Sequence, residues 1–547
     1  MKIEILMNDW YGWKEYSVDE YIIWVKGYFL NNTHEYVLNS FATIISKSDK
    51  KLDELIDFCN TIRGHFAIII YNKNQLFVMA DKVRSIPLFY KYVNNKITVS
   101  NHSPILAKNI NDKKYSPTAV IEISMSGYTI GKKTILSDIY QMNAGEFLLL
   151  SNKKIKTIRY YYYTPWKEKY ISKEACKKEL TKVSKSILLD MVNSAKGRQI
   201  VVLLSAGHDS RFIVSGLKEL NVKNVVCFSY GDKDSFEVKI AKQIADKLSY
   251  KWIHIPLSIP IQKKSFLESV FDNYCDFSDS LSNSPIVMDY TAIKAIKYLN
   301  IIDSNAVFVN GNSGDFITGG HIFDFEHNNS NDSGVEAVLD RIIEKHYSLW
   351  ECLKTEKNIS NIRESLKESL IEIMNTFKLS DKDLWAVSES MEWLGGQSKF
   401  VTATQRSYEF FGYDWRLPMW DPMYMDFWER VPKEYKVKQK LYKEWLYENN
   451  WGGVWCDDIK VNEFNVSSKN VRILRVLFKS IFFVLGKEKW NKFDKKVFWY
   501  FIDNTSSTAI EPYTNILLDR CGARNRNSWI SKNYLNDKMI NFKSLYE

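Results

Sequence analysis

A short run of small and polar residues, Ser205-Ala206-Gly207-His208-Asp209-Ser210, has the composition of an anion-binding loop. It lies between the apolar runs 199–204 and 212–217, which predict a buried strand and a helix. Small residues let backbone N–H groups approach an anion, and a helix N-terminus adds positive partial charge. Asp209 adds a carboxylate that suits a bridging Mg²⁺. The run therefore predicts a phosphate site, with an ordinary capped strand-to-helix turn as the alternative.

Strands that alternate with helices surround this loop and continue beyond it. The pattern predicts helices over 174–193 and 236–248 and strands over 224–230, 252–255 and 307–309. Such alternation is typical of a doubly wound parallel sheet, an α/β fold, and ligands bind such sheets at the carboxyl ends of their strands. A second Gly-rich loop, residues 310–320, follows the last of these strands. We expect the two loops to meet at one edge of the sheet.

The first part of the chain has a different pattern. Short apolar runs around polar turns predict an α+β sandwich built from the strand pairs 66–71 with 75–80, 88–92 with 97–100, and 145–150 with 155–162. Residues 163–173 read as a linker, and beyond about 330 the chain is predicted to be mostly helical. We therefore predict two domains, 1–162 and 174–547.

The composition narrows the class of protein. A chain of 547 residues is too long for one core, and no apolar stretch reaches the roughly 20 residues that span a bilayer. The N-terminus has no signal-peptide pattern. Seven scattered cysteines without a CxxC pair support neither a disulfide framework nor a zinc site, so a cytoplasmic location is expected.

The formal net charge of +10 raises the question of an anionic partner. No nucleic-acid-binding motif accompanies it, so a solvated basic face is favoured over nucleic-acid binding. Much of the excess lies between 469 and 496, around the apolar segment 473–485. We expect a core helix there. The alternative is an interfacial helix that touches anionic lipid, which would place the protein peripherally at the inner membrane face.

Four ordered motifs resemble those of the asparagine synthetase family. The loop at 205–210 is similar to its Ser-Gly-Gly-x-Asp-Ser pyrophosphate loop, with Ala206 at the first Gly. Residues 63–67 with 80–90 are similar to "NGxFA … ARDxxGxxPLYY", 310–320 to "SGEGxDExxGGY", and 412–421 to "GxExRxPFLD". The resemblance implies a class II glutamine amidotransferase-like (Ntn-type) N-terminal domain and an ATP-pyrophosphatase synthetase domain.

The departures from the family pattern bear on function. The family's nucleophilic Cys after the initiator Met is Lys2 here, the nearest cysteine is Cys59, and the Asn of "NGxFA" is Arg63. Without that thiolate and that oxyanion donor, glutamine hydrolysis is not expected. Family members that lack the Cys include the β-lactam and carbapenam synthetases. The Glu of the Gly-rich loop is Asn312. The pattern also resembles asparagine-synthase-like proteins of surface-polysaccharide biosynthesis.

The resemblance implies ATP and Mg²⁺ as cofactors and assigns roles to residues of this sequence. Metal binding is implied for Asp209 and Asp315, with helix capping as the alternative for Asp315. Substrate binding is assigned to Arg211 and Asn312, and Arg416 and Asp421 are expected to form a fixed ion-pair network. The residues implied in nucleotide binding are Leu203, Ser205, Gly207, Asp209, Ser210, Tyr230, Asn310 and Gly311.

Asp209 is also a candidate catalytic residue, and a lysine and a general base are considered in addition to it. The family places a Lys that neutralises charge on the α-phosphate transition state, and Lys460 is the best positional match, with Lys399 and Lys440 as rivals. His208 is expected to be incidental. Glu392 is a candidate base for the amine, although a structural role is favoured.

The combined prediction is an ATP-dependent, AMP-forming amide ligase that joins a small-molecule carboxylate to ammonia or an amine. The alternatives are an asparagine synthetase that uses aspartate and a catalytically silent scaffold.

Overall fold

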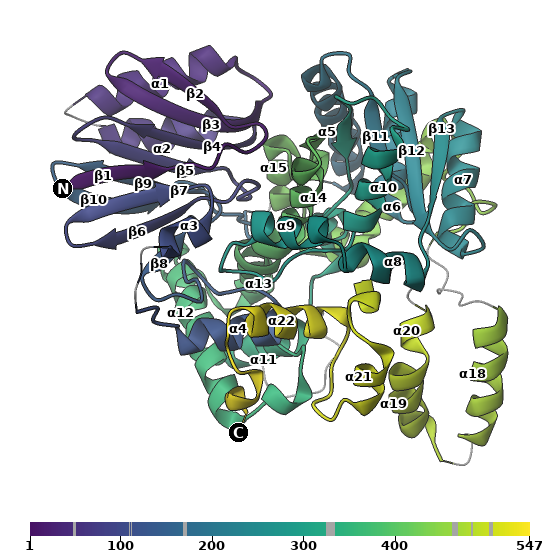
Figure 1. Ribbon diagram of the computed structural model, residues 1–547. Coiled ribbons are helices and arrows are strands. Elements are labelled where there is room, and N and C mark those ends of the chain that lie inside the picture. Colours follow the sequence, from purple (N-terminus) through teal and green to yellow (C-terminus); the bar gives the residue numbers. More distant parts are fainter. Residues whose placement is uncertain are drawn as a thin grey trace.

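The computed structural model describes residues 1–47, 51–108, 110, 112–167, 172–323, 334–461, 469–482, 485–502 and 507–546. It is a mixed α/β structure with an N-terminal part built on two sheets, a parallel sheet, and a helical C-terminal part (Figure 1). In Figure 1 the N-terminal sheets lie on the left, the parallel sheet on the right, and the C-terminal helices below.

The N-terminal part is an α+β sandwich. A six-stranded antiparallel sheet has the order β10-β9-β5-β4-β3-β2, and a four-stranded sheet has the order β1-β7-β6-β8. The strands are β1 Lys2–Leu6, β2 Lys14–Val18, β3 Tyr21–Phe29, β4 Gly64–Tyr71, β5 Leu76–Ala80, β6 Phe89–Val93, β7 Lys96–Ser100, β8 Ile139–Gln141, β9 Glu146–Ser151 and β10 Lys154–Arg159. The helices are α1 His34–Ser46, α2 Lys51–Thr61, α3 Ser103–Ala107 and α4 Pro117–Ser126.

Strand alternation explains how the larger sheet is covered on both faces. Ile68 and Ile70 of β4 pack in one cluster with Phe41 of α1, whereas Ile69 between them packs in another with Val99 of β7. Successive side chains of a strand point to opposite faces of the sheet. Because both faces are buried here, nearly every residue of β4 is apolar.

The parallel sheet has the order β13-β12-β11-β14-β15, and its pairings are all parallel. The chain runs outward from β11 to β13 on one side and then returns to the other side of β11 as β14. The strands are β11 Ile200–Leu203, β12 Val225–Gly231, β13 Lys251–Pro256, β14 Val307–Val309 and β15 Asp414–Arg416. The helices of this region are α5 Lys173–Ala195, α6 His208–Glu219, α7 Phe236–Leu248, α8 Ile259–Phe266, α9 Ser269–Ser278 and α10 Tyr290–Leu299.

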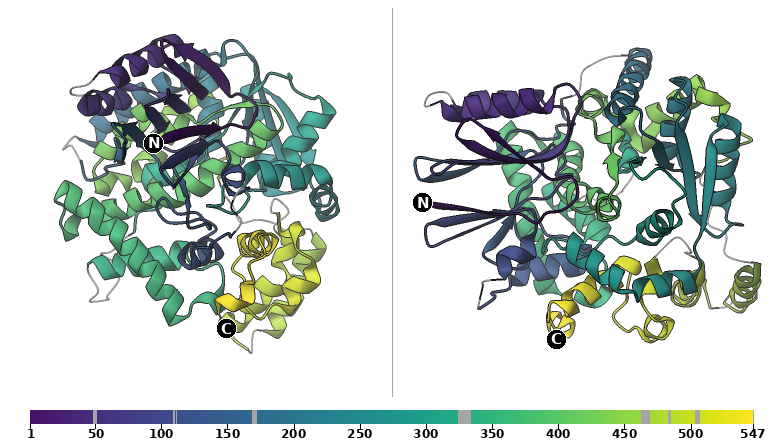
Figure 2. Two further views of the ribbon diagram at one scale, coloured as in Figure 1. Left: turned by 60° about the vertical axis from the view of Figure 1, so that its left-hand side comes forward. Right: turned by 45° about the horizontal axis from the view of Figure 1, so that its top comes forward.

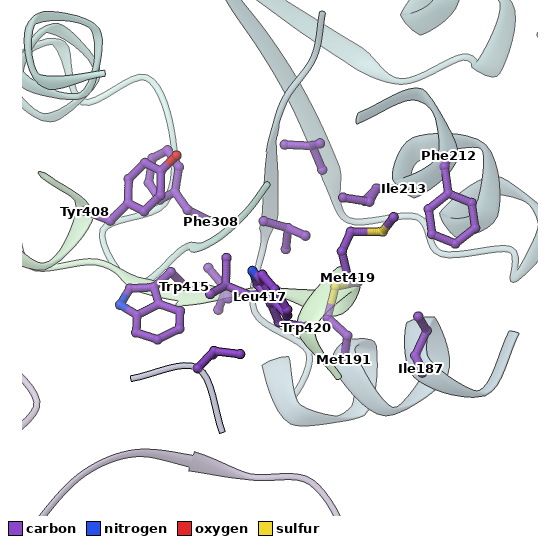
Figure 3. Packing of buried hydrophobic residues seen from close by; sticks show 14 of the residues in the cluster. Ile187, Met191, Phe212, Ile213, Phe308, Tyr408, Trp415, Leu417, Met419 and Trp420 are labelled. Atoms are coloured by element: carbon purple, nitrogen blue, oxygen red, sulfur yellow. The ribbon is translucent and has the colours of Figure 1, made fainter. Parts of the chain in front are cut away.

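The core of this part joins the sheet to its flanking helices. Phe212 and Ile213 of α6 lie near Ile187 and Met191 of α5, and Phe308 of β14 stacks on Tyr408 with 4.7 Å between ring centroids (Figure 3). The start of α6, which follows the phosphate-loop motif, is thereby held rigidly.

The remaining elements are mostly helical and lie between the two sheet regions and along one side of the molecule (Figure 2). They are α11 Val335–His346, α12 Glu356–Phe377, α13 Leu384–Glu392, α14 Gln405–Phe410, α15 Pro422–Arg430, α16 Lys433–Lys436, α17 Lys440–Asn449, α18 Lys469–Ile481, α19 Lys487–Val497, α20 Trp499–Ile502, α21 Tyr513–Leu518 and α22 Arg526–Asp537. The π-helical turns η1 Phe316–Gly320 and η5 Trp393–Val401 and short 3₁₀ turns connect them. Within the described residues, no helix is both long and apolar enough to cross a bilayer.

Most predicted elements are present. The three N-terminal strand pairs form antiparallel hairpins, and α7 and β14 have the predicted bounds. Strands β1, β2, β3, β8 and β15 were not predicted. The start of the predicted linker is packed rather than free, because Tyr163 is fully buried, and 168–171 lie outside the described residues. The division into 1–162 and 174–547 stays a prediction.

Two predictions were wrong. The segment 473–485 does not form a core helix: α18 covers most of it and exposes its apolar side chains, while 483 and 484 lie outside the described residues. The sequence also gave no support for a disulfide, but the structure contains one between Cys352 and Cys521, 169 positions apart. Their spacing carried no sequence signal because the pairing joins η3, Glu351–Leu353, to the distant segment before α22.

Candidate active site

The two loops predicted to meet do meet. The phosphate-loop motif connects β11 to α6, and residues 310–315 connect β14 to η1. Because β11 and β14 are neighbouring parallel strands, both loops leave the same edge at the point where the strand order reverses. This is where open α/β sheets bind ligands. A Cβ at Gly311 would lie 2.7 Å from Asp209 Cβ, so only glycine permits this approach.

Serine side chains fix the shape of the first loop. The Ser210 hydroxyl accepts from the Ser205 N–H at 3.1 Å, and the two hydroxyls are 3.1 Å apart. Ser205 Oγ in turn accepts from the Gly207 N–H at 3.1 Å. Gly207 is the N-cap of α6, so the loop ends directly at a helix N-terminus. The loop thus has the hydroxyls, amides and helix end that an anion site requires.

Asp209 and Asp315 are brought together although they are distant in sequence. The Asp315 N–H donates to Asp209 Oδ2 at 3.0 Å, whereas Asp209 Oδ1 is buried without a hydrogen-bond partner. Burial raises the pKa of Asp209 to about 8, and the charge of Asp315 adds to the effect. Two carboxylates this close repel each other unless a cation lies between them.

These features fit a divalent cation. A buried carboxylate oxygen without a donor is costly, and a hard cation would satisfy it. Asp315 would supply the second carboxylate of this cation site, and its side chain is more exposed than that of Asp209. Its Oδ1 accepts from the Phe316 N–H at 2.8 Å, so Asp315 also makes the capping contact considered as the alternative. Among the described residues, no group of three or more His, Cys, Asp or Glu side chains forms a ready metal cluster. A cation here would therefore depend on ligand oxygens as well.

Gly314→Ala tests whether the position of the Asp209 carboxylate matters. A Cβ at residue 314 would lie 2.3 Å from Asp209 Cγ. The obstructing atoms belong to a side-chain end that can rotate away, so we expect a small change in melting temperature together with at least a tenfold loss of ATP turnover. Thermal melting and AMP release measured on one preparation check this. Unchanged turnover would show that the carboxylate position is not critical.

His321 is a site residue that sequence reasoning missed. Its ring joins Asp315 Oδ2, at 3.1 Å from Nε2, to Glu392 Oε1, at 2.5 Å from Nδ1. Burial disfavours a charge on this ring, but the two carboxylates outweigh burial and raise its pKa to about 9. His321 is therefore a cation at neutral pH that orients Asp315. Its place directly after Gly319-Gly320 was the only sequence signal.

Glu392, for which a structural role is predicted, lies among three basic side chains. In addition to its contact with His321, its Oε2 forms ion pairs with Lys345 at 3.0 Å and His346 at 3.3 Å. Although burial opposes it, this cationic surrounding holds the pKa of Glu392 well below its usual range. Such a carboxylate is a weak base for an amine.

The two asparagines of the second loop lie beside Asp315. Asn310 is buried, accepts from the Asn312 N–H at 3.2 Å, and donates to Gln405 Oε1 at 3.3 Å. Asn312 is half-buried and donates to Thr404 Oγ1 at 2.6 Å. Both amides thus connect the loop to the start of α14, and their predicted ligand contacts stay predictions.

Leu203 and Tyr230 lie on adjacent strands of the same sheet. Leu203 ends β11 in register with Phe228 of β12. Tyr230 is half-buried near the end of β12, and its hydroxyl donates to Asp289 Oδ1 at 2.6 Å. Both residues are near the carboxyl edge, where their nucleotide contacts are predicted.

Arg211, for which substrate binding was predicted, contacts backbone carbonyls of the phosphate loop and of the segment around Lys460. Its side chain is fully buried, and its guanidinium donates to the carbonyls of Ala206, Ile459 and Lys460 at 2.8–2.9 Å. The geometry favours a positioning role over the predicted contact with substrate, because these carbonyls already accept from both terminal nitrogens of the guanidinium. Arg211 connects the phosphate loop to the segment that carries Lys460.

The three lysines predicted as candidates for catalysis lie in different surroundings, and the choice of Lys460 stays a prediction. The Lys460 backbone is tied to the loop, and its side chain is exposed. Lys399 is fully buried and donates to the carbonyls of Thr129 and Gly131, and burial lowers its pKa well below the usual range. Lys440 begins α17. His208 stacks on Trp455, 6.1 Å between ring centroids, and burial lowers its pKa to about 4.

The expected Arg416–Asp421 network is not formed. Arg416 donates to Ser194 Oγ at 2.7 Å and lies over the Tyr28 ring. Asp421 instead accepts from Arg63 Nη2 at 2.9 Å, and the same nitrogen contacts Asp190 at 2.7 Å. Arg63 lies just before β4, so its guanidinium connects the N-terminal sandwich to the region of the parallel sheet.

Two family models match the chain. Residues 51–162 match a glutamine amidotransferase domain, and residues 188–448 match asparagine synthase. The asparagine synthase match covers slightly less than half of the chain. It contains both loops of the candidate site and supports a carbon–nitrogen ligase that uses ATP. Lys460 lies beyond the matched range.

Comparisons with whole proteins add little. A search of curated proteins gives no significant match. Solved structures that are retrieved include an allosteric regulatory enzyme of purine biosynthesis, 12% identical, with 44% of this chain and 61% of that chain covered. A glutamine phosphoribosylpyrophosphate amidotransferase from B. subtilis is 10% identical, with 63% and 74% covered. Both have TM-scores of 0.18, too low to indicate a shared fold.

Proposed function

We propose that this protein is an AMP-forming amide ligase that activates a carboxylate as an acyl-adenylate and transfers the acyl group to ammonia or an amine. The observation that carries the proposal is the junction of Asp209 and Asp315 at the switch point of the sheet, with Asp209 Oδ1 left without a donor. In a simple strand-to-helix turn, burying a carboxylate oxygen without a hydrogen-bond partner would only destabilise the fold. A domain division at 1–162 and 174–547 is part of the proposal.

Each bond change in the proposed reaction is defined. A substrate carboxylate oxygen attacks the α-phosphorus of ATP, the bond to the β-phosphate oxygen breaks, and pyrophosphate leaves. The amine nitrogen then attacks the acyl carbon, loses a proton, and displaces AMP to leave an amide. Bound Mg²⁺ would neutralise phosphate charge, and Asp209 and Asp315 are the residues that would hold it.

The loop residues would bind and orient the nucleotide. Ser205, Gly207 and Ser210 would offer hydroxyl and amide donors to the phosphates, and Leu203 and Tyr230 would flank the base or ribose. Asn310 and Gly311 would lie against the α-phosphate or adenylate, and Asn312 against the substrate. Their support is the shared edge of β11, β12 and β14 on which they lie.

Lys460 is proposed to offset charge on the α-phosphate transition state, so Lys460→Ala should lower kcat about 100-fold or more. Ground-state ATP binding should change little, because the charge that Lys460 opposes develops during reaction. Lys440→Ala is the matched control and should retain most activity. Single-turnover AMP formation separates the two, and equal losses in both variants would refute the assignment.

Glutamine hydrolysis is not part of the proposed function. Arg63, at the position of the family's oxyanion Asn, is committed to Asp190 and Asp421. Cys59 is buried, and burial raises its thiol pKa well above the usual range, which disfavours the reactive thiolate. We therefore expect no glutamate from glutamine.

The decisive experiment measures AMP and pyrophosphate release with Mg-ATP, candidate carboxylates and ammonia. Aspartate is tested first, because the asparagine synthase match favours asparagine synthesis as the second candidate function. Uronic acids and peptides follow, in line with the resemblance to polysaccharide-biosynthesis proteins. ATP binding without AMP from any carboxylate or amine would support a silent scaffold instead.

A further inference from the structure

Helix α18 exposes an apolar face that the ligase proposal does not use. Ile473, Leu477 and Ile481 recur at four-residue spacing and therefore share one side of the helix. Together with Leu474 and Val476 they are between 46% and 68% exposed. An exposed apolar stripe of this size marks an interaction surface.

The orientation of this stripe is fixed by contacts on another side of the helix. Phe478 and Phe482 lie 5.4 and 4.7 Å from the Phe493 ring of α19, centroid to centroid. Arg475 forms a two-pronged ion pair with Asp494, with both contacts at 2.7 Å. Helix α18 is therefore already docked on α19, and the face that it leaves exposed is the one not used in that docking.

The charge around this stripe indicates an anionic partner. Helix α18 contains four basic residues and no acidic one, and α19 contains five lysines against Glu488 and Asp494. A second copy would bring two equally basic helices together, and like charges disfavour that pairing. The remaining partner chemistry combines an apolar interior with a negatively charged surface.

We propose that α18 is an interfacial helix that binds an anionic lipid bilayer. Apolar side chains on one face with lysine and arginine on the other are the hallmarks of such helices. Helix α18 lies at the edge of the molecule beside α19 and α20 (Figures 1 and 2). Val471 in its first turn lines a cavity with Gly231 and Pro256, the last residues of β12 and β13. Helix α18 would thus lie between the bilayer and the ends of β12 and β13.

Vesicle co-sedimentation of the full-length protein tests the proposal. We expect binding to vesicles of phosphatidylcholine with 30% phosphatidylglycerol, and at least tenfold weaker binding to phosphatidylcholine alone. Raising the salt concentration should weaken binding, because lipid charge is screened. Equal binding to both vesicle types, or no binding to either, would overturn the proposal.

Variants test whether vesicle binding depends on α18 or on other exposed apolar residues. Leu477→Glu combined with Ile473→Ser should lower vesicle binding at least tenfold, while melting temperature and AMP release without vesicles stay unchanged. Leu299→Glu is the matched control, since Leu299 is a comparably exposed apolar residue on another helix, α10. If the double variant instead converts a dimer to a monomer in sedimentation velocity, the face binds a second copy and the lipid proposal fails.

Discussion

Asp209→Asn is expected to abolish ATP-dependent AMP formation, with a loss of at least 1,000-fold, and at the same time to stabilise the fold. The amide keeps an oxygen that can accept from the Asp315 N–H but removes the charge that would bind a cation. Replacing the carboxyl group removes the cost of burying its charge, together with its repulsion from Asp315, and should add about 0.5–2 kcal/mol to the free energy of unfolding. AMP release and urea unfolding in EDTA measure the two effects.

The pH dependence of this stabilisation has a defined sign. Burial, aided by Asp315, raises the pKa of Asp209 from 3.8 to about 8, so between these values the folded state holds a proton that the unfolded state has lost. The parent therefore loses stability as pH rises through this window, whereas asparagine does not titrate. The difference in free energy of unfolding between Asp209→Asn and the parent should widen from about pH 4 to 8 and then level off. A constant gap would mean that Asp209 is not the strained group.

Arg63→Asn is expected to destabilise the protein by about 3 kcal/mol, because it leaves the carboxylates of Asp190 and Asp421 without their partner. Asp421 is almost fully buried, so water cannot replace the guanidinium. The substitution also installs the residue that the amidotransferase motif has at this position, yet no glutaminase activity should appear. Differential scanning calorimetry and a glutamate assay measure the two outcomes.

An exposed ion pair serves as the control for Arg63. Lys185→Ala removes an ion pair with Glu219 in which both side chains are more than one-third exposed. This substitution should lower the free energy of unfolding by less than about 1 kcal/mol. If Arg63→Asn costs no more than this control, Arg63 does not connect the two parts of the molecule. Activity that falls in proportion to stability would assign Arg63 a structural role only.

Much of the fold could be predicted because local patterns determine it. The hairpins around Asn94-Asn95 and the helix at 236–248 have turn residues and apolar spacing that need no distant partner. Strand β15 is only three residues long and pairs with β14 more than one hundred positions earlier, so no local pattern indicates it. The apolar run at 473–485 predicted a helix correctly but not its burial, because composition does not reveal whether a neighbour covers it.

In the candidate site, too, the features set by local motifs could be predicted, and those set by distant partners could not. The motif residues Asp209 and Asp315 could be named from the sequence, and their loops lie at one edge because parallel strands end together. The interactions around them could not be predicted. Arg211 connects the loop to backbone carbonyls near Lys460, and His321 joins two carboxylates from separate elements. Such long-range polar contacts depend on tertiary packing.

The late position of β15 has a consequence for synthesis on the ribosome. The edge of the parallel sheet at β14 stays unpaired until residues 414–416 have emerged, and Arg63 must wait for Asp421. Contacts of such long sequence separation slow folding and leave a strand edge open to mispairing in the meantime. Nascent chains that stall between β14 and β15 should therefore be the species most prone to aggregation and most dependent on chaperones.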